Sequence, residues 1–353
     1  MENADAPIRY RVARELYNDG DAAKRIEPEF YKNPEVVKWL KLLKPDTPPQ
    51  HRSMEHGSFN FCLENSLLKT TQLGLHAGMP AVRNAVRYYI SKAGHLPGKP
   101  YRGRANDGVF IFGCNLLACA GFTDGAVIGF LRESLEEMYG FVQKGSYDIY
   151  CGETERAALK NLPAVYRERK IIKSSVVDAH GFCFPLIYDV VGLSGLYAHG
   201  DAETDKKIDA VIRYISTDEF HETVADGYGV LPPYHGRYHT MGWDPKYPGW
   251  SGVAGHIERC GAGRDASKLL FFAQYVVKYP RARQTKWFGE LSDCLEKYRT
   301  DGGTYIFPAK WLDESRGYAV QGHHLSFGEN RRKRNWAEIE STFYMQTLRK
   351  YIM

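Results

Sequence analysis

Apolar residues recur at helical intervals along most of this chain. Asn33 can cap a helix that starts at Pro34, and apolar residues then line one face of it, at Val36, Val37, Leu40 and Leu43. Ser58 can cap a second helix, whose apolar side carries Phe59, Cys62, Leu63, Leu67 and Leu68. Near the C-terminal end, Asn335 and Glu338 have the spacing of a capping box before another apolar helical pattern. Together these patterns predict an all-α fold.

Pairs of helices joined by a turn recur along the sequence. Residues 74–78 end one helix before a second helix that closes at 85–91, and residues 195–200 end another before a helix that closes at 210–216. Segments 109–139 and 265–298 have the same pattern, with turns at Gly121 and near Pro280. Hairpins of helices spaced by tens of residues are typical of helical repeat folds.

Three Asp-Gly pairs precede an aromatic or aliphatic residue, at Asp107-Gly108, Asp226-Gly227 and Asp301-Gly302. Asp can hydrogen-bond its own backbone and Gly can adopt a positive φ, so each pair predicts a tight turn. With these turns and hairpins, the sequence resembles the α/α-toroid proteins, which include the terpene cyclases and the protein prenyltransferase β-subunits. Those proteins connect successive helical hairpins through Asp-Gly-Gly-aromatic turns. The resemblance covers residues 58–353 and implies an α/α toroid, a barrel of helices around a central cavity.

The resemblance implies an architecture and carries over no reaction. The chain lacks the Asp-x-Asp-Asp motif of class II terpene cyclases and has no Gln-x-x-x-Gly-x-Trp repeats. The stretch from Asp178 to Cys183 does not match the Asp-x-Cys pair with which protein prenyltransferases hold zinc. We therefore expect residues 1–50 to form an N-terminal helical extension and residues 51–353 to form the toroid domain.

Composition excludes several classes of protein. The 353 residues are 43% hydrophobic and 25% charged, which argues against a disordered, collagen-like or coiled-coil chain. The net charge of +5 is too small and diffuse to indicate nucleic-acid binding. Aromatic residues are frequent, with 24 Tyr, 17 Phe and 6 Trp, as in proteins whose aromatic side chains wall a deep pocket. Large cores use aromatic residues too.

The seven cysteines form no C-x-x-C pair and no zinc-ribbon spacing, so we expect reduced thiols in a reducing compartment. The first residues contain no apolar core of a signal peptide. The longest uncharged stretch, Val109 to Thr123, is interrupted by glycines and favours a buried helix over a transmembrane span. We expect a cytoplasmic protein without a membrane span. The sequence does not indicate its oligomeric state.

The segment from Asp226 to Trp250 is the leading candidate site. It is rich in glycine, proline and aromatic residues, and it resembles a long irregular loop of the kind that carries function. His239 is the candidate acid–base residue, with Asp244 and Tyr238 as orienting or electrostatic partners. Candidate substrate-binding residues in the segment are Tyr234, His235, Trp243 and Trp250. The structural alternative is an ordered loop whose aromatic residues pack on the barrel rim.

Two further clusters could contribute to the same site. Of the adjacent His323 and His324, one is expected to line the cavity, with Glu329 as a partner. His56, a further candidate catalytic residue, precedes the helix expected to start at Ser58, and Glu64 shares a face of that helix with Asn60. Apolar residues surround these two, so we expect one polar residue there to point inward, and Glu64 and His324 are candidate substrate-binding residues. The basic run from Arg331 to Arg334 is either a solvated lead-in to a helix or a clamp for a phosphate or carboxylate.

Metal and cofactor chemistry are disfavoured by the motifs. His235 and His239 have the H-x-x-x-H spacing of a zinc pair, but this spacing serves one ion only on a helix. Gly236 and the prolines at 232 and 233 argue against a helix there. The chain has no P-loop, no dinucleotide fingerprint, no G-x-S-x-G elbow and no EF-hand loop, so we expect no metal and no cofactor.

These observations favour a cofactor-independent enzyme of the lyase, isomerase or cyclase type. It would use general acid–base chemistry on a small organic molecule in the central cavity, where water is excluded. The alternatives are a glycoside hydrolase or polysaccharide lyase, and a non-catalytic helical scaffold. For the leading hypothesis, the loops near His56, His239 and His323–His324 should converge at one end of the barrel. We expect mostly helix, with little strand outside short segments near Tyr305.

Overall fold

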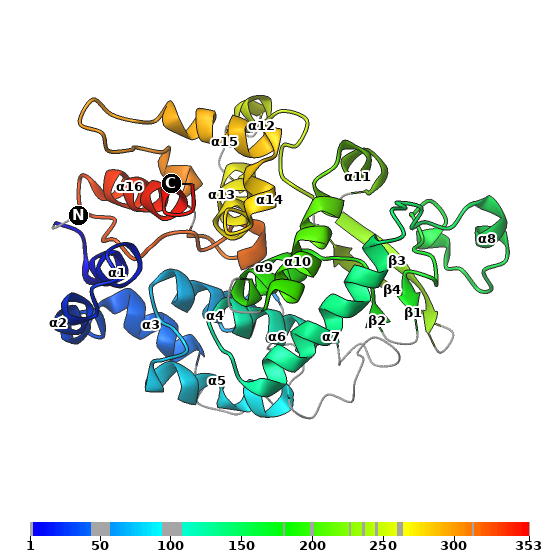
Figure 1. The fold of residues 1–353 in the computed structure, drawn as a ribbon, viewed down its shortest axis with the longest axis horizontal. Helices are drawn as coiled ribbons and strands as arrows, with labels where there is room; N and C mark the ends of the chain where they lie inside the picture. Colours follow the sequence, from blue (N-terminus) through cyan, green and yellow to red (C-terminus); the bar gives the residue numbers. More distant parts are fainter. Residues whose placement is uncertain are drawn as a thin grey trace. The chain divides into compact units, whose positions relative to one another are not determined.

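The computed structural model describes residues 3–43, 57–93, 108–178, 181–197, 201–225, 227–234, 237–243, 246–259, 264–312 and 314–352. The chain is mostly helical, as the sequence predicts (Figure 1). It divides into two compact units. Unit 1 comprises Met1–Tyr89, Cys119–Phe122 and Pro248–Met353, and unit 2 comprises Ile90–Ala118 and Thr123–Tyr247. The predicted boundary between residues 50 and 51 falls within 44–56, outside the described residues.

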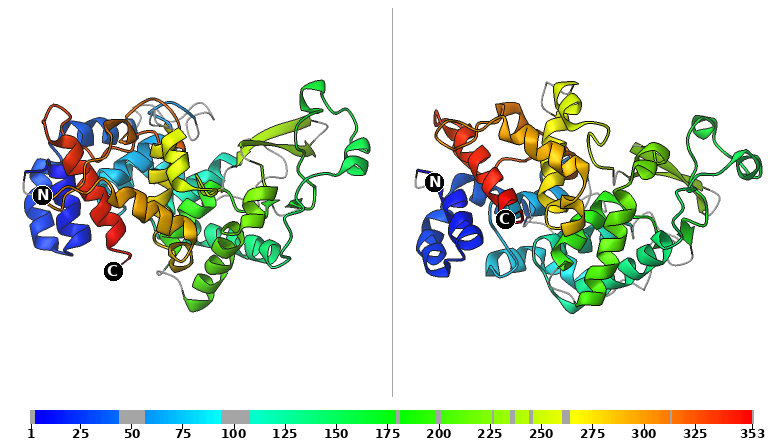
Figure 2. Two further views of the ribbon diagram at one scale, coloured as in Figure 1. Left: turned by 90° about the horizontal axis from the view of Figure 1, so that it is seen from above. Right: turned by 45° about the horizontal axis from the view of Figure 1, so that its top comes forward.

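Unit 1 combines helices from both ends of the chain. Its N-terminal elements are α1 (Ala6–Arg11), a π-helical turn (Val12–Leu16), α2 (Gly20–Phe30), α3 (Pro34–Leu43), α4 (Leu63–Gln72) and the first residues of α5 (Pro80–Ala93). Its C-terminal elements are α12 (Val253–Arg259), α13 (Arg264–Val276), α14 (Pro280–Arg283), α15 (Lys286–Glu296), the 3₁₀ turns Ala309–Trp311 and Ala319–Gln321, and α16 (Trp336–Arg349). Helix α3 packs on α4, and α16 packs on α13 and on the π-helical turn (Figure 2).

Unit 2 contains helices and two small antiparallel sheets. Its helical elements are α6 (Gly108–Cys119, whose last residue belongs to unit 1), α7 (Gly125–Val142), α8 (Glu153–Ala157), the 3₁₀ turn Ala164–Tyr166, α9 (Ile187–Leu196), α10 (Ala202–Ile215) and α11 (Asp218–Thr223). Helix α7 packs against α9 and α10. Strands β1 (Val177–Asp178) and β2 (Gly181–Phe182) form one pair, and β3 (Gly227–Tyr234) and β4 (Arg237–Trp243) form the other.

The segment expected to be an irregular loop is instead the β3–β4 hairpin, so that expectation is wrong. The strands pair from Gly227 opposite Trp243 to Tyr234 opposite Arg237, with an irregularity between Leu231 and Tyr234. The two prolines at 232 and 233 explain the irregularity, because proline cannot donate a ladder hydrogen bond. Tyrosine, valine and threonine favour extended backbone, and this preference outweighs the glycines. Near Tyr305 there is only an isolated bridge to Arg299.

The predicted helix starts are partly confirmed. The Asn33 side chain accepts hydrogen bonds from the backbone of Glu35 and Val36, as a cap of α3 should. Helix α4 starts at Leu63 and not near Ser58, so Asn60 precedes the helix and does not share a face with Glu64. Helix α16 follows Asn335, but the Asn335 side chain makes no capping hydrogen bond.

Three of the four predicted helical hairpins contain two helices in the expected places, including α6 and α7 on either side of Gly121. The segment 265–298 contains three helices, because the short α14 lies between α13 and α15. Of the Asp-Gly turns, the one at Asp301 is a turn as predicted, but the positive φ lies at Gly303 and not at Gly302 of the pair. Gly227 instead starts strand β3, and Asp107 and Asp226 lie outside the described residues. Among the helices in the described ranges, none is long and apolar enough to cross a membrane.

Candidate functional site

Helix α4 carries a polar stripe although it is buried on nearly every side. Asn65, Lys69 and Gln72 follow one another at intervals of four and three residues, which places them on one face of the helix. Their exposed fractions are 0%, 1% and 4%. A fully buried lysine is rare unless its charge is paired. This face therefore has to meet polar partners from elsewhere in unit 1.

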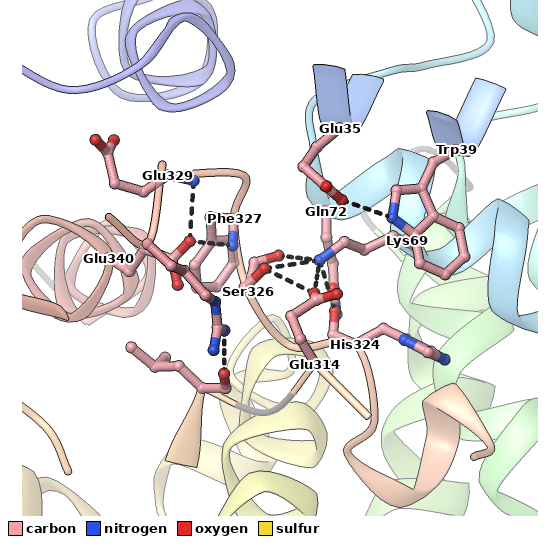
Figure 3. Close-up of polar contacts among 12 residues, drawn as sticks. Glu35, Trp39, Lys69, Gln72, Glu314, His324, Ser326, Phe327, Glu329 and Glu340 are labelled. Atoms are coloured by element: carbon pink, nitrogen blue, oxygen red, sulfur yellow. Dashed lines mark hydrogen bonds and ion pairs between the residues drawn. The ribbon is translucent and has the colours of Figure 1, made fainter. Parts of the chain in front are cut away.

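The partners of Lys69 come from a loop near the C-terminal end of unit 1 (Figure 3). The Lys69 ammonium donates to the carbonyl oxygens of His324 and Ser326, at 3.1 and 2.6 Å, and to Ser326 Oγ at 3.0 Å. It also forms an ion pair with the Glu314 carboxylate. Ser326 Oγ in turn donates to Glu314 Oε1 at 2.7 Å. A lysine, a carboxylate and a hydroxyl thus form one connected cluster.

Glu314 links this cluster to solvent. Its side chain is 20% exposed, whereas that of Lys69 is fully buried. Burial alone would raise the pKa of Glu314, but the charge and hydrogen bond of Lys69, with the Ser326 hydroxyl, hold that pKa below its usual value. Glu314 is therefore ionised at neutral pH.

A second buried carboxyl group supports the same loop from α16. Glu340 Oε1 accepts the backbone N–H groups of Phe327 and Glu329, at 2.9 and 3.1 Å (Figure 3). A buried loop needs such side-chain partners, because its backbone lacks the ladder of a helix or sheet. Among the described residues, Glu340 Oε2 has no hydrogen-bond partner.

Burial raises the pKa of Glu340 to about 7, although Lys69, Arg331 and the two backbone donors act in the opposite direction. Its carboxyl group is therefore divided between the protonated and the ionised form near neutral pH. Glu314 and Glu340 thus differ in protonation although both belong to unit 1. Carboxyl pairs with pKa values displaced in opposite directions are a common basis for acid and base roles.

His324 is held in an unusual backbone conformation. Its φ is +65°, in the left-handed region that costs a non-glycine residue about 1 kcal/mol or more. The buried imidazole lies edge-on to the Trp39 indole, with ring centroids 5.0 Å apart (Figure 3). Burial lowers the pKa of His324 to about 4, so the ring is neutral at pH 7. Within the described part of the chain, Nε2 of this ring has no hydrogen-bond partner.

The Gln72 side chain adds a further unsatisfied polar group. Both its Oε1 and its Nε2 are buried without a partner among the residues that the structure describes. Most buried polar side-chain atoms in proteins are hydrogen-bonded, so an exception requires an explanation. Here three exceptions, on Gln72, His324 and Glu340, belong to the residues that surround the Lys69–Glu314 pair. We refer to Lys69, Gln72, Glu314, His324, Ser326 and Glu340 as the Lys69 cluster.

The neighbouring predicted residues have intramolecular partners. His323 Nδ1 is 2.8 Å from Ser315 Oγ. Glu329 is not bonded to a histidine, since it accepts the Asp5 backbone N–H at 2.8 Å and pairs with Lys333. In the basic run, the Arg331 guanidinium donates to the Leu312 carbonyl and lies over the Trp336 ring. With Lys333, which donates to Glu329, two of the four basic side chains have structural roles.

The predicted hairpin residues belong to unit 2. His239 lies on β4 opposite Leu231, and Tyr234 and Trp243 are paired in the same ladder. The Tyr238 side chain is buried beside Ile171 and Val230, and its hydroxyl donates to the Lys160 carbonyl at 2.9 Å. His56, His235 and Asp244 lie outside the described residues. The assignment of catalysis to His239, Asp244, Tyr238 and His56 stays a prediction.

Of the other predicted residues, Glu64, Trp250 and His324 all belong to unit 1. Glu64 is fully buried on α4, in agreement with the expectation that one polar residue there points inward. Trp250 lies in the turn before α12 and is half-buried. The expected convergence of the loops near His56, His239 and His324 stays a prediction.

Sequence reasoning missed Lys69, Gln72, Glu314 and Glu340. The sequence of α4 contained a signal, because polar residues recur on one face of the helix, at Asn65, Lys69 and Gln72. Glu340 is a weaker case, since it follows Ile339 within the apolar pattern of the last helix. No local pattern marks Glu314, whose role depends on a partner 245 residues away.

Comparison of this chain with known protein families, with curated proteins and with solved structures found no match. In the described ranges, no three His, Cys, Asp or Glu side chains are grouped so that they could hold a metal ion. The geometry of the Lys69 cluster is therefore the observation from which we infer a function.

Proposed function

We propose that this protein is an acid–base enzyme of the lyase, isomerase or cyclase type, and that its reacting groups are those of the Lys69 cluster. One observation carries the proposal: among the described residues, buried side-chain atoms of Gln72, His324 and Glu340 lack hydrogen-bond partners, and these three residues lie around the Lys69–Glu314 ion pair. Unsatisfied groups, a left-handed non-glycine residue and displaced pKa values each tend to occur at functional sites. In this protein all three features occur in one cluster.

The cluster supplies groups suited to moving protons on a small organic molecule. Glu340 can donate or accept a proton near neutral pH, which is the range in which general acid–base catalysis is most effective. Glu314 remains ionised, and Lys69 holds its carboxylate in place. The neutral His324 ring and the Gln72 amide can hydrogen-bond a hydroxyl or carbonyl group.

A glycoside hydrolase or polysaccharide lyase is the second candidate. Such enzymes commonly use two carboxyl groups, one protonated and one ionised, and Glu340 and Glu314 differ in this way. The two candidates predict different substrates for the same cluster. They can be compared in one assay that contains both small organic acids and sugars.

The proposal also covers the arrangement of the helices, the cellular location and the class of substrate. We propose that the helices form an α/α toroid, supported by the three helical hairpins and the turn at Asp301. We also propose a cytoplasmic enzyme with a small-molecule substrate, supported by the number and spacing of the cysteines. An experimental structure with the closed ring of hairpins would test the first point.

The proposal is tested by deuterium exchange. The purified protein is incubated in D2O with a defined mixture of small organic acids, polyols and sugars, and loss of C–H signals is followed by ¹H NMR. An acid–base enzyme exchanges the hydrogen that it abstracts. Glu340→Gln should slow the exchange by about 10²–10⁴-fold. Glu338→Gln is the matched control on the same helix, because the Glu338 carboxylate accepts a hydrogen bond from Thr304, outside the cluster. Equal rates in both variants would remove Glu340 from the mechanism.

A further inference from the structure

Two phenylalanines of unit 1 form an exposed stack. The rings of Phe59 and Phe61 lie 5.2 Å apart between centroids and 12° from parallel, and they are 46% and 43% exposed. Most other large apolar side chains in the described part of the chain are buried. The Arg316 guanidinium lies 4.1 Å from the centroid of the Phe59 ring, within the range of a cation–π contact. We refer to Phe59, Phe61 and Arg316 as the Arg316 stack.

The fully buried Asn65 amide holds the backbone segments that carry the Arg316 stack. Asn65 Nδ2 donates to the carbonyl oxygens of Gly57 and Phe59, both at 2.9 Å. Asn65 Oδ1 accepts the backbone N–H of Ala319 at 2.8 Å. One side chain therefore holds both segments that carry the stack. Such a preorganised surface loses little conformational entropy when a ligand binds.

Arg316 presents an exposed guanidinium. Its side chain is exposed, and within the described ranges it makes no hydrogen bond and no ion pair. A guanidinium presents five N–H donors in a planar fork, which matches the two oxygens of a carboxylate. A cation that already lies against an aromatic ring favours a ligand that combines an anionic group with an apolar ring.

The Arg316 stack lies close to the Lys69 cluster along two paths. Arg316 is two residues from Glu314, so their Cα atoms are at most about 7 Å apart. Asn65, which holds the stack, is one helical turn from Lys69 on the same face of α4, a rise of about 6 Å. Glu314 is also the member of the Lys69 cluster that reaches solvent. The Arg316 stack and the Glu314 side chain therefore belong to neighbouring parts of unit 1.

We infer that the Arg316 stack is a binding subsite for a planar aromatic carboxylate. The ring packs against the exposed surface of the two phenylalanines, and the carboxylate accepts hydrogen bonds from Arg316. Phenylalanine has no hydroxyl with which to bond the hydroxyl groups of a sugar, which favours an aromatic acid over a sugar acid. The inference rests on the proposed function only where it takes this acid to be the substrate.

The inference is tested with benzoate as the probe, by saturation-transfer NMR and a titration of the full chain. Benzamide removes the charge, cyclohexanecarboxylate removes the planar ring, and glucuronate replaces the ring with a sugar. Benzoate should bind, and each of the three other probes should bind at least about tenfold more weakly. Equal or tighter binding of glucuronate would overturn the aromatic assignment. Failure of benzoate to bind would overturn the subsite.

Two variants test whether benzoate binds at the Arg316 stack. Arg316→Gln and Phe61→Leu should each weaken benzoate binding by about three- to tenfold or more, because both side chains are exposed and contribute at the surface. Arg334→Gln is the control, since Arg334 is also an exposed arginine of unit 1. Circular dichroism checks that each variant is folded. Unchanged affinity in Arg316→Gln would place benzoate elsewhere.

Binding and turnover remain separable. If benzoate binds at the stack and no aromatic acid exchanges hydrogen in D2O, the subsite stands and the proposed function fails for this class of acids. If exchange depends on Glu340 but not on Arg316, the proposed function stands and the Arg316 stack does not hold the substrate.

Discussion

The ammonium of Lys69 and the carboxylate of Glu314 form a buried ion pair, although 245 residues separate them in the chain. The pair joins a helix of the N-terminal part to a loop of the C-terminal part. Lys69 also satisfies two backbone carbonyls of that loop. The same side chain thus stabilises the loop and sets the charge of the candidate site.

Lys69→Met should destabilise the protein by about 3–5 kcal/mol, the usual effect of removing one partner of a buried ion pair. The variant leaves the Glu314 charge and the carbonyls of His324 and Ser326 without their donor. Urea unfolding followed by circular dichroism measures the change. Adding Glu314→Gln should recover part of the loss, because the uncompensated charge is then removed.

Lys38→Met is the control for this experiment. Lys38 also pairs with a glutamate, Glu35, but the two side chains are 47% and 38% exposed. Exposed pairs contribute about 0–1 kcal/mol. If Lys38→Met and Lys69→Met had the same effect, the Lys69 pair would not have the energetic role assigned to it.

Glu340→Gln should change how stability depends on pH. The folded pKa of Glu340 is raised to about 7, above its ordinary value of 4.5. Between these values the folded state binds more protons than the unfolded state, so this group makes stability fall as pH rises. Above about pH 7, ionisation of the buried Glu340 carboxyl group lowers the unfolding free energy by its full amount, on the order of 3 kcal/mol. Glutamine removes this cost because it does not ionise.

The measurement is the difference in unfolding free energy between Glu340→Gln and the parent protein, from about pH 5 to pH 8. Taking the difference cancels the contributions of other titrating groups, such as His324, whose lowered pKa of about 4 acts with the opposite sign. The variant should gain stability relative to the parent as pH rises. A difference that does not vary with pH would show that Glu340 titrates at its ordinary value.

His239→Ala distinguishes the hairpin from the Lys69 cluster as the site of chemistry. If His239 were the acid–base residue, its removal would slow deuterium exchange by about 10²–10⁴-fold. We expect little change, because the proposed reacting groups belong to unit 1. Tyr238→Phe should cost about 0.5–1.5 kcal/mol of stability through the lost bond to Lys160, with exchange unaffected. A large loss of exchange in either variant would restore the hairpin as the site.

Asn65 variants should uncouple the two segments that this residue holds. Asn65→Ala leaves the Gly57 carbonyl and the Ala319 N–H without their partner, and it removes one of the two donors to the Phe59 carbonyl, which the Cys62 N–H also bonds. The variant should cost more than about 2 kcal/mol of stability. Asn65→Asp keeps the acceptor for Ala319 but loses both donors. Amide hydrogen exchange should therefore speed up at Ala319 in Asn65→Ala and less in Asn65→Asp. Equal exchange at Ala319 in both variants would contradict the assigned hydrogen bond.

The helices could be predicted from the sequence because their signals are local. The Asn33 cap, the Pro34 start and the apolar face of α3 all depend on residues within two turns. The β3–β4 hairpin was missed because its glycines, prolines and histidines resemble a loop. Pairing with a partner strand decided its conformation, and strand preference depends strongly on such context.

The candidate site was largely hidden from the sequence for a physical reason. Burial and long-range pairing determine the chemistry of Lys69, Glu314 and Glu340, and neither can be read from neighbouring residues. His324 was identified from its type alone, and its left-handed backbone and its contact with Trp39 appear only in three dimensions. The Asn65–Lys69–Gln72 spacing was visible but was not used.

The sequence separation between Lys69 and Glu314 has a consequence for how the protein is made. A ribosome adds about 5–20 residues per second, so the partners of Lys69 emerge roughly 10–50 seconds after it. During that interval α4 cannot be buried without leaving the Lys69 ammonium unpaired, and the 3₁₀ turn Ala319–Gln321, which packs on α4, has not yet been made. The nascent chain must therefore keep this helix hydrated or shielded by a chaperone until synthesis has passed Ser326.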